Sequence, residues 1–556
     1  MFENIKKLKE NENIKNILAI IVAGLLGIIF FILIYGIDKL NVTNEKWLLN
    51  GEDLAQHYIG WKFFRQSKWN WKIGIMNNIN YPYNASIILT DSIPLFAIIF
   101  KIFSKFLPDN FQYFGIYGLI TFMLQGIFSY LLVYRFVKDR KYSIIASIFF
   151  ILSPTIIQRE YSHTALASHY IILMALCLWA YNESLKEKEI LKNILWILLG
   201  LLSASIHLYF VPMVMIIMAT TFFIDYIKDK KIKNNIITVV VTCICIFIEI
   251  YLLGGFTFDS SIKYGEHGLG QYNSNLNTFF NPYEINKSLL REMPILFGQY
   301  EGFGYLGCGI IALSAILLYD FIKEEDKKTI LINKYIISGF ILCSMSIIIA
   351  TALSFSINQH LIFKITFPTK LESIISTFRA TGRFIWLACY LITLVAIVNV
   401  YKNIKNKKYS YVFIMVVLFI QIYDLRGYII EKHQIFNNYD NEYVFNFEEQ
   451  INISKYNEIV FLPADNVSRE FKNIYKIANL AIDNGMKINN FYMARNNLKT
   501  TEYSENIIEK LCNNEVDEKI IYIILDNELV TRIKDKNTFL NFYNMENYTI
   551  AVYSEK

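Results

Sequence analysis

The sequence has few charged residues for its length. Only 18% of its 556 residues are Asp, Glu, Lys or Arg, whereas 54% are hydrophobic and 16% are aromatic. This composition excludes collagen-like, disordered and small disulfide-rich proteins. The net charge of +6 does not indicate nucleic-acid binding, because the lysines gather between apolar segments.

Cysteine is also scarce and provides neither a disulfide framework nor a metal motif. Six of the seven cysteines lie inside apolar segments, and only Cys512 lies in the polar C-terminal region. No Cys-X-X-Cys pair or Cys/His cluster marks a structural zinc site. The C-terminal region also lacks a glycine-rich phosphate loop and a Gly-X-Ser-X-Gly elbow. We therefore expect the other six cysteines to be small buried apolar residues.

What the sequence has instead is a series of apolar segments of membrane-spanning length. A helix of about 20 residues crosses the roughly 30 Å hydrocarbon layer of a bilayer. The first segment, Ile17–Ile37, follows four lysines and has no small-X-small cleavage site after it. It is therefore expected to be a retained transmembrane helix rather than a signal peptide. The sequence predicts a polytopic α-helical membrane protein.

The lysine-rich connections predict the topology. Short connections rich in Lys and Arg face the cytoplasm, and all of them reach that side if segment 92–107 does not cross. This segment is short, carries Lys101 and Lys105, and is bracketed by Pro94 and Pro108. We expect an interfacial helix whose lysines snorkel to water. About eleven transmembrane helices then place the N-terminus inside and the C-terminus outside a plasma (inner) membrane.

Two domains are expected. Residues 1–430 form the transmembrane domain, with a long first outer loop at 38–110. From Glu431 the chain becomes polar, and strands separated by helices predict a small extracytoplasmic α/β domain at 431–556. The predicted strands are 458–462, 519–525 and 548–553, and the predicted helices are 469–484, 503–513 and 528–541.

The first polar constellation follows the first apolar segment. If Gly51–Arg65 is a helix, Asp53 and His57 lie on one face at i, i+4 spacing. Such a carboxylate and imidazole could accept a proton or hold a hydroxyl substrate. Alternatively, Asn50 caps the helix, and Glu52 and Asp53 only favour its N-terminal dipole.

Asp91 is the acidic residue of a second constellation. It lies between Thr90 and Ser92, just before Pro94. It is either a second acid in the same cavity as Asp53 or an N-cap of the helix that Pro94 begins.

A third constellation is basic and lies near the predicted outer face. Ionisable residues at membrane depth usually line a polar cavity, and the alternative is isolated histidines with satisfied hydrogen bonds. His163 and His169 are six residues apart and do not form an HxxxH metal pair. The residues concerned are Arg159, His163, His169 and His207.

Two arginines begin a later apolar segment. Arg379 and Arg383 fall on one helix face, and no acidic residue lies within four positions of them. Two guanidinium groups at a helix N-terminus form an anion site suited to phosphate, unless they only snorkel to lipid head groups. The long Gly/Asn/Tyr-rich loop from Gly265 towards Glu301 suits a lid or a sugar site, or is a flexible connection.

Together these segments resemble the GT-C superfamily of polytopic membrane glycosyltransferases, and most closely a bacterial branch of it. The shared pattern is an acidic pair after the first span, a long first outer loop and a polar outer turn after the third span. Here the pair is ordered Glu-Asp, only one proline stands in 90–95, and no WWDYG motif is present. The matching segments are Gly51–Arg65, Tyr81–Leu95, Gly270–Pro282, Glu301–Gly307 and Phe378–Trp386.

The resemblance implies an enzyme that transfers a sugar from a polyprenyl-phosphate donor to an envelope glycan, lipid or protein. It makes Asp53 the general base and Glu52 its acidic neighbour. The remaining residues expected to bind substrate are His57, Asp91, Arg159, His163, His169, His207, Glu301, Arg379 and Arg383. A divalent cation stays open because the sequence has no clear ligand motif. The alternatives are a transporter of a polar or anionic envelope precursor, or a non-catalytic scaffold; no nucleic-acid partner is expected.

Overall fold

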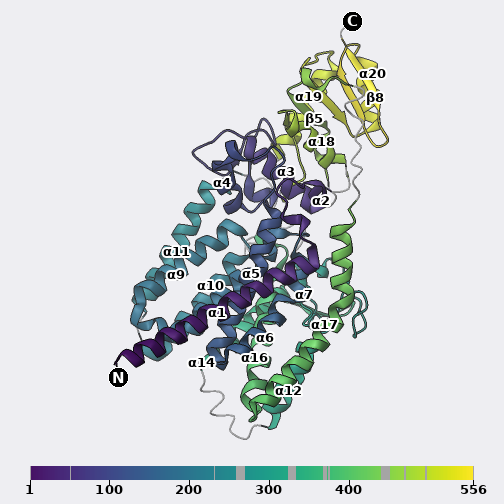
Figure 1. The fold of residues 1–556 in the computed structure, drawn as a ribbon. Helices are drawn as coiled ribbons and strands as arrows, with labels where there is room; N and C mark the ends of the chain where they lie inside the picture. Colours follow the sequence, from purple (N-terminus) through teal and green to yellow (C-terminus); the bar gives the residue numbers. More distant parts are fainter. Residues whose placement is uncertain are drawn as a thin grey trace.

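The protein combines a large helical body with a small sheet domain (Figure 1). The computed structural model describes residues 2–49, 52–230, 232–257, 269–323, 334–366, 368, 372, 376–439, 451–468, 471, 473–494 and 498–554.

Apolar helices, most of them long, form the body. They are α1 (Phe2–Tyr35), α5 (Phe114–Val137), α6 (Arg140–Ile151), α7 (Pro154–Arg159), α8 (Tyr170–Tyr181), α9 (Glu189–Ile206), α10 (Phe210–Asp229), α11 (Lys233–Leu252), α12 (Cys308–Lys323), α14 (Lys334–Ala350), α16 (Ile385–Asn403) and α17 (Lys407–Asn437). Eight stretches of the described chain are long and apolar enough to cross a membrane. The protein is a membrane protein.

The eight stretches do not map one to one onto the eleven predicted spans. The stretch Thr164–Ile206 holds both α8 and α9. The described parts of two other predicted spans, α12 and α14, contain 16 and 17 residues, below the about 20 residues with which a perpendicular helix crosses the hydrocarbon layer.

The segment between α1 and α5 folds into short elements at one end of the bundle. They are η1 (Asp38–Leu40), α2 (Lys46–Leu49), α3 (Glu52–Gln66), β1 (Ile75–Met76), β2 (Ala85–Ser86), η2 (Ile87–Thr90), α4 (Pro94–Ile102) and η3 (Ser104–Phe106), where η denotes a 3₁₀ helix. With nine residues, α4 is too short to cross a bilayer.

The lysine on α4 does not reach water in the way that the sequence suggested. Lys101 is 4% exposed, and its Nζ lies 4.0 Å from the Phe64 ring centre and 4.5 Å from that of Trp69. Cation–π attraction therefore replaces snorkelling at this position. Lys105 is exposed, as expected.

The other connections add short elements. They are η4 (Thr164–Ala167), η5 (Asn182–Lys188), η6 (Gln299–Gly302), β3 (Ser354–Ile357), β4 (His360–Lys364), η7 (Ser376–Phe378) and η8 (Thr381–Phe384).

The C-terminal domain is a five-stranded sheet with three helices. Strand order is β6-β5-β7-β9-β8, with β5 parallel to β6 and β7, and β9 antiparallel to β7 and β8. Its elements are η9 (Ile453–Lys455), β5 (Glu458–Leu462), η10 (Ala464–Asn466), α18 (Asn473–Asp483), β6 (Lys487–Ile488), α19 (Leu498–Cys512), β7 (Ile520–Ile524), α20 (Asn527–Lys536), β8 (Leu540–Asn544) and β9 (Thr549–Tyr553).

The predicted α/β pattern lacks two of the observed strands, β6 and β8. The predicted helix 528–541 stops at Lys536, and Leu540–Asn544 is an edge strand. The predicted domain boundary at residue 430 falls inside α17, which continues to Asn437.

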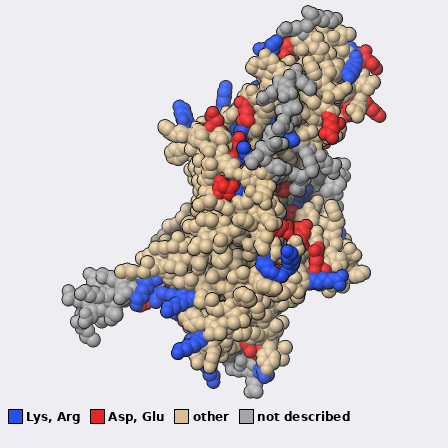
Figure 2. Space-filling view, turned by 45° about the vertical axis from the view of Figure 1, so that its right-hand side comes forward, with Lys and Arg blue, Asp and Glu red and all other residues tan. Residues whose placement is uncertain are grey.

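The sheet domain rests on the segment that follows α1, at the top of Figure 1. Lys62 on α3 donates to Asn479 Oδ1 at 2.8 Å and pairs with Asp483, both on α18. The Ala494 backbone N–H donates to the Leu89 carbonyl at 2.9 Å. We call this end of the bundle the domain-bearing end. In Figure 2 a broad tan area on the left of the body separates the charges at this end from mainly basic side chains below.

Candidate functional site

Helix α3 carries the first two candidate residues. His57 is fully buried, with its ring stacked on Phe114, and burial lowers its pKa to about 4. The imidazole is therefore neutral at physiological pH. Asp53, one turn earlier, contacts His163 from another segment. The Glu52 side chain, Asn50 and Gly51 lie outside the described residues.

A strained turn presents Asp91 to α3. Asp91 and Ile93 both have φ of +51°, which costs energy for a residue with a Cβ and especially for β-branched Ile. Ser92, between them, donates from its Oγ to the His57 carbonyl at 2.7 Å. The hydroxyls of Thr90 and Ser92 lie 2.8 Å apart. Asp91 thus follows η2 as a fixed turn residue and does not cap α4, whose N-cap is Ile93.

Gly60 makes the approach of this turn to α3 possible. A Cβ at Gly60 would lie 2.5 Å from Thr90 Oγ1 and 2.7 Å from Ser92 Oγ. Such distances are too short for non-bonded atoms, so a larger residue here requires the turn to move away from His57.

Two further histidines reach these carboxylates from the body. His163, after α7, places its Nε2 3.7 Å from Asp53 Oδ2. His207, at the end of α9, places its Nε2 3.4 Å from Asp91 Oδ1. Because His207 Nδ1 accepts from the Tyr209 N–H at 3.2 Å, neutral His207 carries its proton on Nε2, towards Asp91.

The electrostatics favour an ionised Asp91. Burial alone would raise the pKa of Asp91, but the hydrogen bond from His207 holds it below its usual range. Burial, with Arg383 as the largest charge contribution, lowers the pKa of His163. We call Asp53, His57, Asp91, His163 and His207 the carboxylate–histidine cluster.

Part of this cluster fits a divalent cation. One ligand atom from each of His57, Asp91 and His163 lies within 4.8 Å of the others. Both ring nitrogens of His57 and Nδ1 of His163 are buried without a hydrogen-bond partner among the described residues. Neutral imidazoles with a carboxylate are ligands for Zn²⁺ and similar metals. No local sequence motif marks this set, because the three residues come from separate segments.

Beside the cluster, Glu301 on η6 joins two arginines. Arg383 binds it in a two-point contact, with Nε 3.0 Å from Oε2 and Nη2 3.1 Å from Oε1. Arg159 Nη2 donates to Oε2 at 2.8 Å. Burial would raise the pKa of Glu301, but the two guanidinium charges hold it well below its usual range. This Arg159–Glu301–Arg383 triad carries one net positive charge.

The predicted pairing of Arg379 with Arg383 on one helix face is wrong. Helix α16 begins only at Ile385, and the residues before it form the short turns η7 and η8. Arg379 is exposed, with its guanidinium 5.3 Å from the Tyr272 ring centre. Arg383 is buried and neutralised by Glu301, 82 positions away, so the absence of a nearby acid in the sequence was misleading.

Two glycines bring Glu301 and Arg383 together. A Cβ at Gly382 would lie 2.5 Å from Gly302 Cα, so the backbones of η6 and η8 touch. The Gly382 N–H also donates to the Tyr272 carbonyl at 2.9 Å. This contact between backbones fixes the positions of Glu301, which precedes Gly302, and of Arg383, which follows Gly382.

His169 is not in the cluster. Its Nδ1 lies 2.7 Å from the Tyr390 hydroxyl, and its ring lies 4.4 Å from that of Trp386. The Arg159 guanidinium also contacts Trp386, 5.5 Å from the ring centre. His169 therefore supports the side chain of Arg159 indirectly, a role that no local sequence pattern marks.

A family model described as a domain of unknown function, DUF6311, matches residues 24–426, and the model of the DUF6311 C-terminal domain matches residues 450–553. No curated protein matches the sequence.

Several solved structures share a distant likeness. The apo oligosaccharyltransferase of Archaeoglobus fulgidus is 9% identical, with a TM-score of 0.42 over 96% of this chain and 74% of that one. The same enzyme tethered to an acceptor peptide is 10% identical, with a TM-score of 0.43 over the same shares. Its complex with an inhibitory peptide and a dolichol-phosphate is 10% identical, with a TM-score of 0.36 over 98% and 75%.

The two family models together run from the first apolar helix to the last strand of the sheet domain. The chain belongs to the DUF6311 family.

Proposed function

We propose that the protein is a membrane glycosyltransferase, which moves a sugar from a polyprenyl-phosphate donor to a cell-envelope acceptor. The observation that carries the proposal is the position of two carboxylates among histidines, directly beside a buried arginine triad. Such a site offers a base for an acceptor and cations for a phosphate. Apolar helices next to it suit a lipid chain.

Asp53 is the general base in this proposal. It takes the proton of an acceptor hydroxyl or amide while the acceptor atom bonds to the anomeric carbon. The bond from that carbon to the phosphate oxygen breaks, and polyprenyl phosphate leaves with the electron pair. The nearby carboxylates stabilise the positive charge that develops on the sugar, as in glycoside hydrolysis. His163, 3.7 Å from Asp53, orients the base.

The arginine triad receives the departing phosphate. Its net positive charge and the remaining N–H groups of Arg159 and Arg383 favour an anion. Exposed Arg379 extends this positive region towards the aqueous side.

A divalent cation held by His57, Asp91 and His163 would supply Lewis acidity for the phosphate oxygens. The residues themselves keep Asp91 ionised and His57 neutral, which is the protonation state that such ligands require.

The orientation is part of the proposal. The basic connections at the opposite end favour a cytoplasmic location for that end of the bundle. The site and the sheet domain then face the outside of a bacterial plasma membrane.

The test is transfer of a radiolabelled sugar from polyprenyl phosphate in membranes that contain the wild type or Asp53→Asn. Asparagine keeps the shape of the side chain but cannot take a proton, so transfer should fall by about a hundredfold or more. Asp109→Asn, exposed in the same segment, should transfer like the wild type. Unchanged transfer by Asp53→Asn would refute Asp53 as the base. Movement of the label across the membrane without a new glycosidic bond would indicate a transporter instead.

A further inference from the structure

A surface of aromatic and basic side chains lies on the segment between α1 and α5, outside the proposed site. It combines the turn at residues 66–74, which follows α3, with η3, which closely follows α4. Neither 66–74 nor 94–107 contains an acidic residue. All but one of the residues concerned are exposed, and Lys72 is half-buried. We call this surface the aromatic–lysine patch; it consists of Lys68, Trp69, Trp71, Lys72, Lys105 and Phe106.

The rings of this patch are far more exposed than aromatic side chains of a folded protein usually are. Trp71 is 63% exposed and Phe106 is 85% exposed. Exposed apolar surface of this kind marks a contact with a protein or a membrane. Tryptophan in particular is enriched where a protein passes from the hydrocarbon layer into the head groups.

The patch lies at the end of a helix that can cross the membrane. Helix α11 belongs to one of the apolar stretches of spanning length. The Gly74 N–H donates to the Leu252 carbonyl at the end of α11, at 3.4 Å, and the Trp71 ring lies 5.4 Å from that of Tyr251. In Figure 1, α4 lies level with the upper end of α11. The patch is therefore at the depth where the hydrocarbon layer ends.

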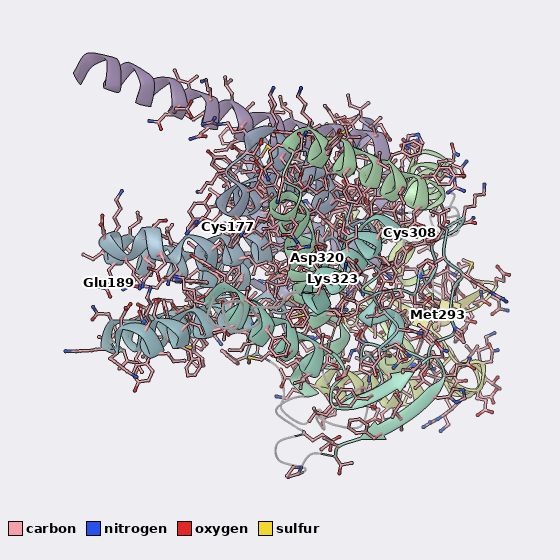
Figure 3. The ribbon with its side chains drawn as sticks, turned by 90° about the horizontal axis from the view of Figure 1, so that it is seen from below. Cys177, Glu189, Met293, Cys308, Asp320 and Lys323 are labelled. Carbon is pink, nitrogen blue, oxygen red and sulfur yellow. The ribbon has the colours of Figure 1, made fainter. Side chains whose placement is uncertain are left out.

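This side of the bundle is also its margin, where lipid surrounds the protein. Helix α11 packs against α9. Glu189, the first residue of α9, is labelled at the edge of the body opposite Met293 in Figure 3. Ile244, Phe247 and Ile248 of α11 are exposed, as expected of an apolar helix in a bilayer. Lipid molecules therefore reach the patch from the side.

Other contacts hold the patch in a fixed arrangement. The Arg65 Nη2 group on α3 donates to the Ser104 carbonyl at 3.0 Å and the Leu107 carbonyl at 2.8 Å. The Lys101 Nζ on α4 lies 4.5 Å from the Trp69 ring centre. These two side chains join η3 to α3 and Trp69 to α4, so the rings of the patch do not depend on a flexible loop for their position.

The three lysines of the patch give it an unbalanced positive charge. Among the described residues, none forms an ion pair with Lys68, Lys72 or Lys105. Lysines at a membrane surface attract anionic lipids, and their aliphatic stems lie along apolar surface while the ammonium groups reach the phosphates. The charge of the patch is thus complementary to a layer of anionic head groups.

We propose that the aromatic–lysine patch binds anionic phospholipid head groups, with Trp69 and Trp71 at the boundary of the hydrocarbon layer and the three lysines on lipid phosphates. Ile93, the N-cap of α4, is two residues from Asp91, so this contact also sets the depth of the carboxylate–histidine cluster. A donor whose phosphate lies among the head groups would meet the cluster at that depth. This last consequence rests on the proposed function, whereas lipid binding does not.

Tryptophan fluorescence of the full-length protein in phosphatidylcholine vesicles tests the contact. The vesicles contain the same small share of either brominated phosphatidylglycerol or brominated phosphatidylcholine, with the bromine near the head-group end of the acyl chain. Bromine quenches only nearby rings, and Trp69 and Trp71 are the exposed members of the seven tryptophans. We expect the anionic lipid to quench about threefold more than the neutral lipid, because the lysines enrich it around the patch.

Two variants locate the contact. In Lys68→Gln/Lys72→Gln/Lys105→Gln, the lysine variant, the two lipids should quench alike, because the rings stay in the membrane without the charges. In Trp69→Phe/Trp71→Phe, quenching by both lipids should fall to the background of the buried tryptophans. Melting temperatures show whether each variant is folded.

The matched control removes three exposed lysines from the sheet domain, in Lys510→Gln/Lys519→Gln/Lys536→Gln, and should keep the wild-type ratio. Equal quenching by the two lipids in the wild type, or a wild-type ratio in the lysine variant, overturns the proposal. Quenching of the wild type no stronger than that of the tryptophan variant overturns it as well and indicates a protein partner. The measurement needs no sugar transfer, so an inactive protein that prefers the anionic lipid keeps the patch and loses only the proposed reaction.

Discussion

At the scale of residues, one buried acid, Glu301, forms ion pairs with two arginines, Arg159 and Arg383. Glu301, Arg159 and Arg383 are each at least nine-tenths buried, and isolated charges at such positions would be costly. Both carboxylate oxygens of Glu301 are used, and Trp386 covers Arg159 from the other side. One positive charge therefore remains, held in a rigid frame next to the carboxylate–histidine cluster.

The two-point contact of Arg383 leads to a prediction. Arg383→Lys keeps the charge but cannot make two parallel hydrogen bonds to Glu301. We expect donor affinity to fall by about tenfold or more, equivalent to about 1.4 kcal/mol, together with a lower melting temperature. Exposed Arg379→Lys is the control and should change the melting temperature little. Equal donor affinities for wild type and Arg383→Lys, measured on purified protein, would contradict a bidentate role.

At the scale of elements, the packing of α3 against the strained turn depends on Gly60. In Gly60→Ala the new methyl group meets Thr90 and Ser92, and overpacking of this kind costs about 1–3 kcal/mol. We expect the Ser92–His57 hydrogen bond to break and transfer to fall by about tenfold or more.

The control for this variant is Gly339→Ala on α14. Nothing lies within 4 Å of a Cβ at Gly339, so alanine there should be neutral or slightly stabilising. Melting curves and transfer assays on both variants check the prediction. Wild-type transfer by Gly60→Ala would show that the turn tolerates displacement.

The sheet domain contains an acid with a shifted pKa, Glu458, at the start of β5. Burial raises the pKa of Glu458 to about 7, although Tyr503 donates to it at 3.2 Å. The folded state therefore binds this proton more tightly than the unfolded chain does. The resulting stability is present below the ordinary Glu pKa and is lost as the pH rises through about 7.

Replacing Glu458 by Gln should remove this dependence. At pH 8 we expect Glu458→Gln to stabilise the domain by up to about 3 kcal/mol, and to leave its stability at pH 4 nearly unchanged. Hydrogen exchange of β5 in the full-length protein at both pH values measures the effect. Exposed Glu509→Gln on α19 should retain the wild-type pH dependence, and the same dependence in Glu458→Gln would assign it to another group.

At the scale of the whole molecule, the proposed site and the sheet domain occupy the same end of the bundle. The domain holds α3 through Lys62 and the turn before Asp91 through Leu89. The sheet domain thus contacts both segments that carry the proposed Asp53 and Asp91 site residues.

The orientation predicts which engineered cysteines react from outside the cell. Thr531→Cys on α20 is exposed and should react with a membrane-impermeant maleimide in intact cells. Lys405→Cys, between α16 and α17, should react only after lysis, because that connection is predicted to be cytoplasmic. Both are made in a Cys512→Ser background. If Lys405→Cys reacts in intact cells and Thr531→Cys does not, the topology is the reverse of the one proposed.

The sequence by itself determined the parts of this protein that depend on local pattern. Apolar length predicted a membrane protein. The prolines on either side of the segment, Pro94 and Pro108, together with its lysines, predicted a short α4 that does not span. Short β-rich runs between helical patterns predicted the strands β5, β7 and β9. These features follow from neighbours along the chain, since one helix turn or one strand buries its own apolar face.

Only the tertiary structure decided which polar residues meet. Asp53 and His57 are one turn apart, but Asp91, His163 and His207 reach them from three other segments, and Glu301 neutralises Arg383 from a distant loop. These contacts depend on close backbone packing at Gly60, Gly302 and Gly382 and on the left-handed turn at Asp91. Sequence patterns link residues within a turn or two, whereas such contacts are fixed by how whole elements pack, so the metal-like cluster and the triad had no local signature.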